Sequence, residues 1–164
     1  MSCNSGDKTT NNETTTDITE TIDTSAVQQN KNLKEITSDA DRIATALMAA
    51  PAESRADCTV MGYNTAGEFV TLKEGTNEYI CIADNPNQDG FNAACYHKDL
   101  EPFMKLGRML KKEGKSSQEI FEMRRKEVES GKIKIPAGSV LYVLTGSYTE
   151  QGHPTDLYQQ FVVY

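Results

Sequence analysis

The chain has no tryptophan, only two histidines and fewer basic than acidic residues. Its 164 residues include 24 acidic and 17 basic side chains, which give a formal charge of −7. This excess of acid argues against a nucleic-acid-binding surface, because phosphate contacts need clustered Lys and Arg. No stretch approaches the ~18 apolar residues of a membrane-spanning helix. The length itself indicates one domain of ordinary size.

Familiar catalytic patterns are also missing. The chain has no G-x-S-x-G, P-loop, G-x-G-x-x-G or H-E-x-x-H sequence. A zinc site needs three or four converging ligands, and the two separated histidines, His97 and His153, make one improbable. Thiol catalysis would require Cys58 or Cys95 within reach of one of these histidines. We therefore predict no catalytic, cofactor-binding or metal-binding residues, and the sequence favours a protein that is not an enzyme without deciding the matter.

Residues 1–31 differ in composition from the rest of the chain. Eight of them are Thr, and the few apolar residues are too scattered to form a buried face. Such a segment cannot bury enough surface to offset the entropy lost on ordering it. We predict a disordered, Thr-rich tether over 1–31, with a root-mean-square extension of roughly 30 Å as a flexible coil, followed by a single domain over 32–164. The simpler alternative is a disordered end without a purpose.

Cys3 suggests a purpose for the tether. A Ser-Cys pair followed at once by a polar, Thr-rich run resembles the mature start of a bacterial lipoprotein, in which the cysteine carries the lipid. No hydrophobic signal segment precedes it, which we interpret as trimming with addition of Met1. We expect Cys3 to be a lipid anchor, and the protein to be extracytoplasmic and membrane-tethered, in the periplasm or at the cell surface. The alternative is a chance cysteine in the head of a soluble protein.

Three segments have the apolar spacing of helices. They lie at about 32–50, 99–113 and 116–130. Ser38 or Asp39 can cap the first helix and Asp99 the second, because short polar side chains accept the free N–H groups of a first turn. Ser116 and Glu119 form a capping-box pattern at the start of the third helix.

Apolar and β-branched runs between Gly- and Asn-containing turns predict the strands. These runs are 58–63, 68–73, 78–83, 133–135, 139–145 and 157–164. We expect the first three to form an antiparallel meander and residues 84–98 to form a long polar loop. The fold class is therefore α+β, with an antiparallel sheet of about five strands, an N-terminal helix and a helical pair inserted between the third and fourth strands. Either the last run ends the fold as a buried strand, or the natural chain continues beyond Tyr164.

Cys81 and Cys95 bracket the expected polar loop, and their separation suits a disulfide that holds this loop onto the third strand. A closed ring of about 15 residues would stabilise the fold by roughly 3 kcal/mol in the chain-entropy model. The bridge requires an oxidising compartment, which the lipoprotein interpretation supplies. Four cysteines allow three full pairings. If Cys3 is lipidated, Cys58 is left over, and we interpret it as an inert buried thiol.

The same loop partly imitates a calcium-binding loop. Asn85, Asn87, Asp89 and Gly90 match part of the D-x-[DN]-x-[DN]-G pattern. Position one is Asn, and position twelve falls on Tyr96, which cannot supply the bidentate carboxylate. We favour a turn-rich loop without calcium, and the sequence leaves calcium binding open.

A motif links this chain to other proteins. It comprises Lys73-Glu-Gly-Thr-Asn77, Tyr79-x-Cys81, Asp84-x-Pro86, Gly90 and then Cys95. The chain resembles an uncharacterised family of bacterial secreted proteins and lipoproteins with an (R/K)EGTN-x-(W/Y)-x-C-x-x-D-x-P segment and a second Cys. The similarity covers roughly residues 39–100, with Tyr79 where the family has Trp and Lys73 where it has Arg. It implies secretion and the two-cysteine loop, and it implies no activity.

These features lead to one preferred function and two alternatives. The preferred one is a cell-envelope lipoprotein domain that binds an unknown ligand or envelope partner without catalysis. The first alternative is a secreted hydrolase-like enzyme that combines loop carboxylates, Asp84, Asp89 or Asp99, with His97 or His153. The second is a structural or assembly protein of the envelope, which would expose an apolar patch or an unpaired sheet edge. Ligand, oligomeric state and the state of Cys58 stay open.

Overall fold

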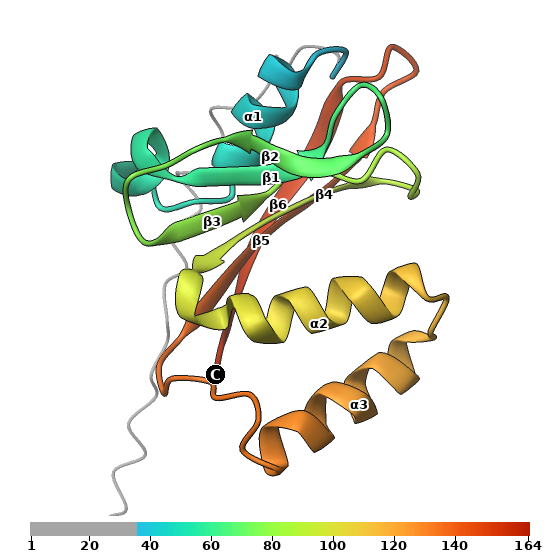
Figure 1. Cartoon of the computed structure of the whole chain (residues 1–164). Helices are drawn as coiled ribbons and strands as arrows, with labels where there is room; N and C mark the ends of the chain where they lie inside the picture. The colour runs from blue at the N-terminus through green and yellow to red at the C-terminus, as the bar shows by residue number, and fades with distance from the viewer. Residues whose placement is uncertain (1–35) are drawn as a thin grey trace, which may run out of the picture.

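A computed structural model describes residues 36–164 of the chain (Figure 1). The tether predicted over 1–31 and its candidate lipid anchor, Cys3, lie outside the described residues. Within residues 36–164, no helix is long and apolar enough to cross a membrane.

Six strands form one sheet in the order β2-β1-β3-β4-β5-β6. They are β1 (Thr59–Tyr63), β2 (Phe69–Lys73), β3 (Tyr79–Ile82), β4 (Phe91–His97), β5 (Val140–Tyr148) and β6 (Pro154–Val163). All neighbouring strands are antiparallel except β1 and β3, which are parallel. The α+β class is confirmed, with a sheet one strand larger than the five we expected.

The first three strands are not the meander that their short turns predicted. After β2, residues 74–78 pass the start of β1, and β3 then pairs with β1 on the side opposite to β2. The backbone N–H groups of Thr76 and Asn77 both donate to the Asp57 carbonyl, at 2.8 and 3.1 Å. A Cβ on Gly75 would overlap backbone atoms of Cys58 and Thr59. This close approach lets a five-residue connection cross the neighbouring strand.

The predicted polar loop over 84–98 was wrong for its second half. Residues 91–97 form β4, where Phe91, Ala93 and Cys95 are buried and Asn92 is exposed. The polar, turn-forming residues 84–90 that precede this strand gave the whole segment the composition of a loop. The helical pair is consequently inserted between the fourth and fifth strands. The run 133–135, expected to be a strand, lies in the irregular connection before β5.

The helices begin where their caps predicted, with one exception. Ser38 forms a capping box with Asp41 at α1 (Asp39–Leu47), and Ser116 forms one with Glu119 at α3 (Ser117–Glu129). Asp99 does not cap α2 (Glu101–Lys112), because it lies inside a short 3₁₀ turn, η3 (Lys98–Leu100), that leads into this helix. A second 3₁₀ turn, η2 (Ala52–Asp57), connects α1 to β1.

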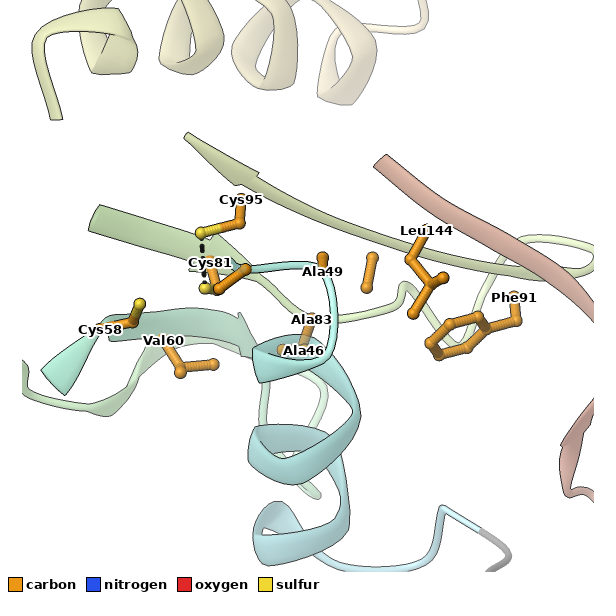
Figure 2. Close-up of a cluster of buried hydrophobic side chains, with 11 residues drawn as sticks. Ala46, Ala49, Cys58, Val60, Cys81, Ala83, Phe91, Cys95 and Leu144 are labelled. Atoms are coloured by element: carbon orange, nitrogen blue, oxygen red, sulfur yellow. Dashed lines mark hydrogen bonds between the residues drawn. The ribbon is translucent and has the colours of Figure 1, made fainter. Parts of the chain in front are cut away.

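The sheet has helices on both faces (Figure 1). Alternate residues of β4 point to opposite faces, so Cys95 faces α1 while Tyr96 faces α2. The core under α1 consists of Ala46, Ala49, Ala50, Cys58, Val60, Cys81, Ala83, Phe91, Ala93, Cys95 and Leu144 (Figure 2). On the other face, Tyr96, Leu100 and Leu110 are buried. α1 lies mainly over β1 to β4, which leaves the α1 side of β5 and β6 less covered.

Candidate functional site

A shallow pocket of about 250 Å³ lies where β3 begins, β4 ends and β5 begins. Its lining residues are Tyr79, His97, Asp99, Pro136, Ala137, Gly138, Ser139, Val140 and Tyr142. The loop before β5 forms one wall, and two hydrogen bonds hold that wall to the end of β6. Gly138 donates to the Tyr164 carbonyl at 2.8 Å, and Tyr164 donates to the Ser139 carbonyl at 2.9 Å.

Cross-strand pairing extends this pocket into an apolar surface that runs to the edge of the sheet. Tyr142 lies opposite Phe161, and Val140 lies opposite Val163. Residues directly opposite each other in an antiparallel pair share a face, so all four lie on the α1 side. Phe161 is 69% exposed and Val163 is 61% exposed. We use the name aromatic groove for the pocket together with the exposed strand residues beside it, and define it by Tyr79, His97, Val140, Tyr142, Phe161 and Val163.

Polar groups lie at one end of the aromatic groove. The Nδ1 atom of His97 is 3.3 Å from the backbone nitrogen of Asp99 and 3.3 Å from its Oδ2. An unprotonated Nδ1 can accept the backbone N–H, and a protonated one can pair with the carboxylate. The His97 ring also packs edge-on against Tyr79, with ring centroids 6.1 Å apart. This end of the groove can therefore both donate and accept hydrogen bonds.

The central tyrosine of the groove stays in its hydroxyl form at neutral pH. Partial burial, together with the nearby Tyr79 and Cys95, raises the pKa of Tyr142 above its ordinary value. A neutral phenol beside apolar side chains can stack against a ring and donate a hydrogen bond at its edge. The groove thus combines apolar contact area with a few polar groups, as ligand sites generally do.

Three cysteines lie in the core beside the groove. The Sγ atoms of Cys58, Cys81 and Cys95 all lie within 4.8 Å of one another, and all three residues are fully buried (Figure 2). Cys81 and Cys95 are directly opposite each other on β3 and β4, with sulfur atoms 2.9 Å apart. A disulfide bond measures about 2.05 Å, and this structure has the three cysteines as free thiols. The Cys81–Cys95 bridge stays a prediction.

The position of this pair differs from the expected one. Cys95 belongs to a strand within the sheet, so a bond to Cys81 would join two paired strands and would not hold down a loop. Burial raises the pKa of Cys58 to about 11. Contact with Cys95 and then burial raise the pKa of Cys81 well above its ordinary value. Cys58 and Cys81 therefore favour the neutral thiol, unless a bond or a cation replaces the proton.

The other predicted candidates lie apart from the groove. Asp84 lies near the opposite end of β4, where its carboxylate accepts hydrogen bonds from Tyr148 and Asn92. His153 lies in the turn between β5 and β6, and its backbone N–H donates to the Thr149 hydroxyl at 3.1 Å. The two loops of the enzyme hypothesis therefore do not line the groove together.

The calcium-like residues are used within their own turn. The Asn85 side-chain oxygen accepts the backbone N–H of Asn87 at 3.0 Å, as in a local turn. In the part of the chain that the structure describes, the three cysteines are the only set of three or more His, Cys, Asp or Glu side chains with converging ligand atoms.

Sequence reasoning missed most of the aromatic groove. Tyr142 and Phe161 were assigned to strands without any functional role, and residues 136–139 only to a turn. The signal in the sequence was the spacing of two residues within each strand. This spacing places Val140 and Tyr142 on one face of β5, and Phe161 and Val163 on one face of β6. The register that places these pairs side by side is not visible in either strand alone.

Comparison with known proteins found no family model, no curated protein and no solved structure that matches this chain.

Proposed function

We propose that this chain is a cell-envelope lipoprotein domain, tethered through Cys3, whose folded part is a non-catalytic module that binds a ligand or an envelope partner in the aromatic groove. The observation that carries the binding role is the row formed by half-buried Tyr142 and exposed Phe161 and Val163 beside a pocket with polar groups. Apolar patches rimmed by polar residues are typical of interaction sites, because exposed apolar area costs free energy unless a partner covers it.

Of the predicted acid–base candidates, His97 and Asp99 share the groove, while Asp84 and His153 lie apart from it. Acid–base chemistry needs both groups within hydrogen-bond reach of the reacting atoms. His97 and Asp99 lie at one end of β4, and Asp84 lies near the other end. Within the groove itself, His97 and Asp99 are the imidazole and carboxylate among the lining residues. These two groups can orient a bound molecule by hydrogen bonding.

The lipid anchor is tested on native protein extracted from its membrane. Mass spectrometry of the N-terminal peptide should find Cys3 modified by acyl chains, and detergent should be needed to keep the protein in solution. An unmodified cytosolic protein that starts with its own Met would overturn the anchor and the proposed location. This outcome would not bear on ligand binding in the groove, which is tested separately.

The groove is tested by NMR titration of the ¹⁵N-labelled full chain with tri-N-acetylchitotriose, a soluble probe with apolar sugar-ring faces and polar edges. We expect amide shifts at Tyr79, His97 and Tyr142. The variant Phe161→Ser should lose them, since Phe161 contributes the outer part of the groove. Tyr158→Ser is the matched control, because Tyr158 is 63% exposed on the opposite face of β6. Amide shifts that are distributed evenly over the whole protein, or that persist in Phe161→Ser, would show that oligosaccharides of this kind do not bind in the groove.

The same strand also favours the assembly alternative. β6 is an edge strand of the sheet whose start carries Pro154 and Asp156, but its second half, residues 157–164, carries no charged side chain. Natural edge strands usually carry charges or proline that prevent pairing with another chain. If assembly is the function, sedimentation should show a concentration-dependent dimer that Phe161→Lys abolishes. A monomer at all concentrations would exclude self-assembly through this edge and leave ligand binding.

A further inference from the structure

The cysteine cluster contains one sulfur atom more than a disulfide needs. Cys81 and Cys95 are paired across two strands, and Cys58 brings a third thiol to the same point from the end of η2. All three Sγ atoms lie within 4.8 Å of one another. With a metal–sulfur bond of about 2.3 Å, three sulfur atoms around one metal ion lie ~4.0 Å apart in a plane. The Cys81 and Cys95 sulfur atoms are 2.9 Å apart, so their side chains must separate by about 1 Å for the cluster to reach that geometry.

The backbone holds this arrangement in place. Cys81 and Cys95 are on central strands of the sheet, so their Cα positions are fixed by hydrogen bonding on both sides. The Cys58 thiol donates to the Ser54 carbonyl at 3.1 Å and lies 3.7 Å from the side-chain nitrogen of Asn77. Both contacts are to groups that do not compete as strong metal ligands. Little ordering free energy would be lost on binding, because the three residues are already ordered.

We propose that, in its reduced state, the cluster of Cys58, Cys81 and Cys95 binds one monovalent copper ion through three thiolates. Soft thiolate ligands select Cu(I), zinc or iron–sulfur clusters. A structural zinc ion requires four protein ligands in a tetrahedron. Across residues 36–164, no fourth Cys, His, Asp or Glu converges on these sulfur atoms. A fully buried set of three sulfur atoms suits Cu(I).

Binding replaces protons with the metal ion. Each thiol that ligates Cu(I) releases its proton to solvent, so the complex has more negative charge than the neutral cluster. The Lys73 ammonium lies next to this site and donates to the Cys58 carbonyl at 3.0 Å. Its charge favours the Cys81 thiolate, and it offsets part of the cost of burying thiolates. No electron transfer is needed, since copper enters and stays as Cu(I).

The proposal does not depend on the aromatic groove. Copper binding and the predicted Cys81–Cys95 disulfide exclude each other. A bond between Cys81 and Cys95 would use two of the three thiolates, so the oxidised protein cannot bind copper in this way. Cys58 distinguishes the two uses of the cluster, because copper binding requires it and the disulfide does not.

The test uses the full chain with Cys3→Ser, which removes the remaining thiol outside the cluster. The reduced protein is titrated with Cu(I) under anaerobic conditions against bathocuproine disulfonate as a competing chelator. We expect one Cu(I) per chain and release of thiol protons. In the matched variant Cys58→Ser the disulfide pair is intact, and the affinity should fall by more than the ~100-fold that loss of an outer-shell partner costs. Circular dichroism establishes that both proteins are folded.

X-ray absorption of the loaded parent protein gives a second readout that needs no variant. Three sulfur ligands at about 2.3 Å would support the proposal. Two sulfur ligands, or an affinity unchanged by Cys58→Ser, would overturn it. Titration with Co(II) addresses the divalent alternative. Intense thiolate-to-cobalt absorption with tetrahedral bands, together with binding that Cu(I) does not displace, would contradict the choice of copper.

Discussion

The Tyr148 hydroxyl donates a 2.5 Å hydrogen bond to Oδ2 of Asp84, although the two residues are 64 positions apart. Oδ1 of the same carboxylate accepts the backbone N–H of Asn92 at 2.8 Å. Asp84 follows β3, Asn92 lies at the start of β4 and Tyr148 ends β5. One carboxylate therefore connects three strands at the end of the sheet opposite to the groove.

Replacing this carboxylate should destabilise the fold. Asp84→Ala leaves the Tyr148 hydroxyl and the Asn92 N–H without their acceptor, and Asp84 is only 8% exposed. We expect the free energy of unfolding to fall by about 1–3 kcal/mol, as measured by urea denaturation. The control is Asp89→Ala, at an exposed position in the same turn, where a change within ~0.5 kcal/mol is expected. Equal losses at both positions would contradict the role of Asp84.

The same residue should make stability depend on pH. Burial raises the pKa of Asp84 above 3.8, even though hydrogen bonds from Tyr148 and Asn92 act in the opposite direction. The folded state therefore binds the Asp84 proton more tightly than the unfolded chain does. Its contribution to stability is complete below pH 3.8 and is lost as the pH rises through the folded-state pKa.

Asp84→Asn removes this titration and provides the measurement. The unfolding free energy of the wild type minus that of the variant should decrease as the pH is raised from 3 towards 7. Other carboxylates titrate in both proteins and cancel in the difference. A difference that increases with pH would show that hydrogen bonding to the ionised form outweighs burial.

Gly75 should tolerate no side chain. A Cβ at this position would overlap backbone atoms of Asp57, Cys58 and Thr59, none of which can rotate away. Gly75→Ala should therefore cost about 3 kcal/mol, at the upper end of overpacking penalties. Gly67→Ala serves as control, since a Cβ there meets nothing within 4 Å and only the positive φ of 79° opposes it. Its cost should be about 1–2 kcal/mol, and thermal unfolding of both variants compares them directly.

Tyr96 should anchor α2 to the sheet. Its buried hydroxyl donates to Glu101 Oε2 at 2.6 Å and accepts from Arg108 Nη1 at 2.8 Å. Tyr96→Phe removes both bonds and should lower stability by about 2 kcal/mol, because both partners are charged. The α2 amides should exchange hydrogen faster in Tyr96→Phe than in the control Tyr158→Phe, which changes an exposed tyrosine. Unchanged exchange in α2 would mean that apolar packing alone holds this helix.

Cys58 should be unreactive in the folded reduced protein. Burial raises its pKa to about 11, so only about 0.1% is thiolate at pH 8, and the thiolate is the form that is alkylated. The protein is treated with iodoacetamide at pH 8, and its peptides are analysed by mass spectrometry. Cys58 should be unmodified in the native protein and fully modified in protein unfolded by urea. The native rate should rise about tenfold per pH unit up to pH 11. Rapid modification at pH 8 would show that the site opens readily.

Features that depend on neighbours in the chain were predicted correctly. The capping boxes at Ser38 and Ser116 need only a residue three positions away, and both helices begin there. The strands at 59–63, 69–73 and 79–82 were also recognisable, because their runs of β-branched and apolar residues are local. The α+β class follows from these elements.

Features that depend on pairing were not predictable in the same way. Residues 91–97 follow the polar run 84–90, and they form a strand because β3 and β5 supply hydrogen-bond partners on both sides. Phe91, Ala93 and Cys95 alternate with Asn92, Ala94 and Tyr96, and that alternation becomes informative only when one face has a core to enter. Asp99 seemed a good cap, but the chain turns into α2 only after an extra 3₁₀ turn.

The sequence by itself determined the helix starts, the strand-forming runs, the composition boundary near residue 32 and the presence of Cys58, Cys81 and Cys95, because each is a property of adjacent residues. Only the tertiary structure decided that β3 lies parallel to β1, that three sulfur atoms meet at one point and that Tyr142 lies beside Phe161. These are consequences of strand order and register. They are set by the combined packing of the whole sheet, and no single segment encodes them.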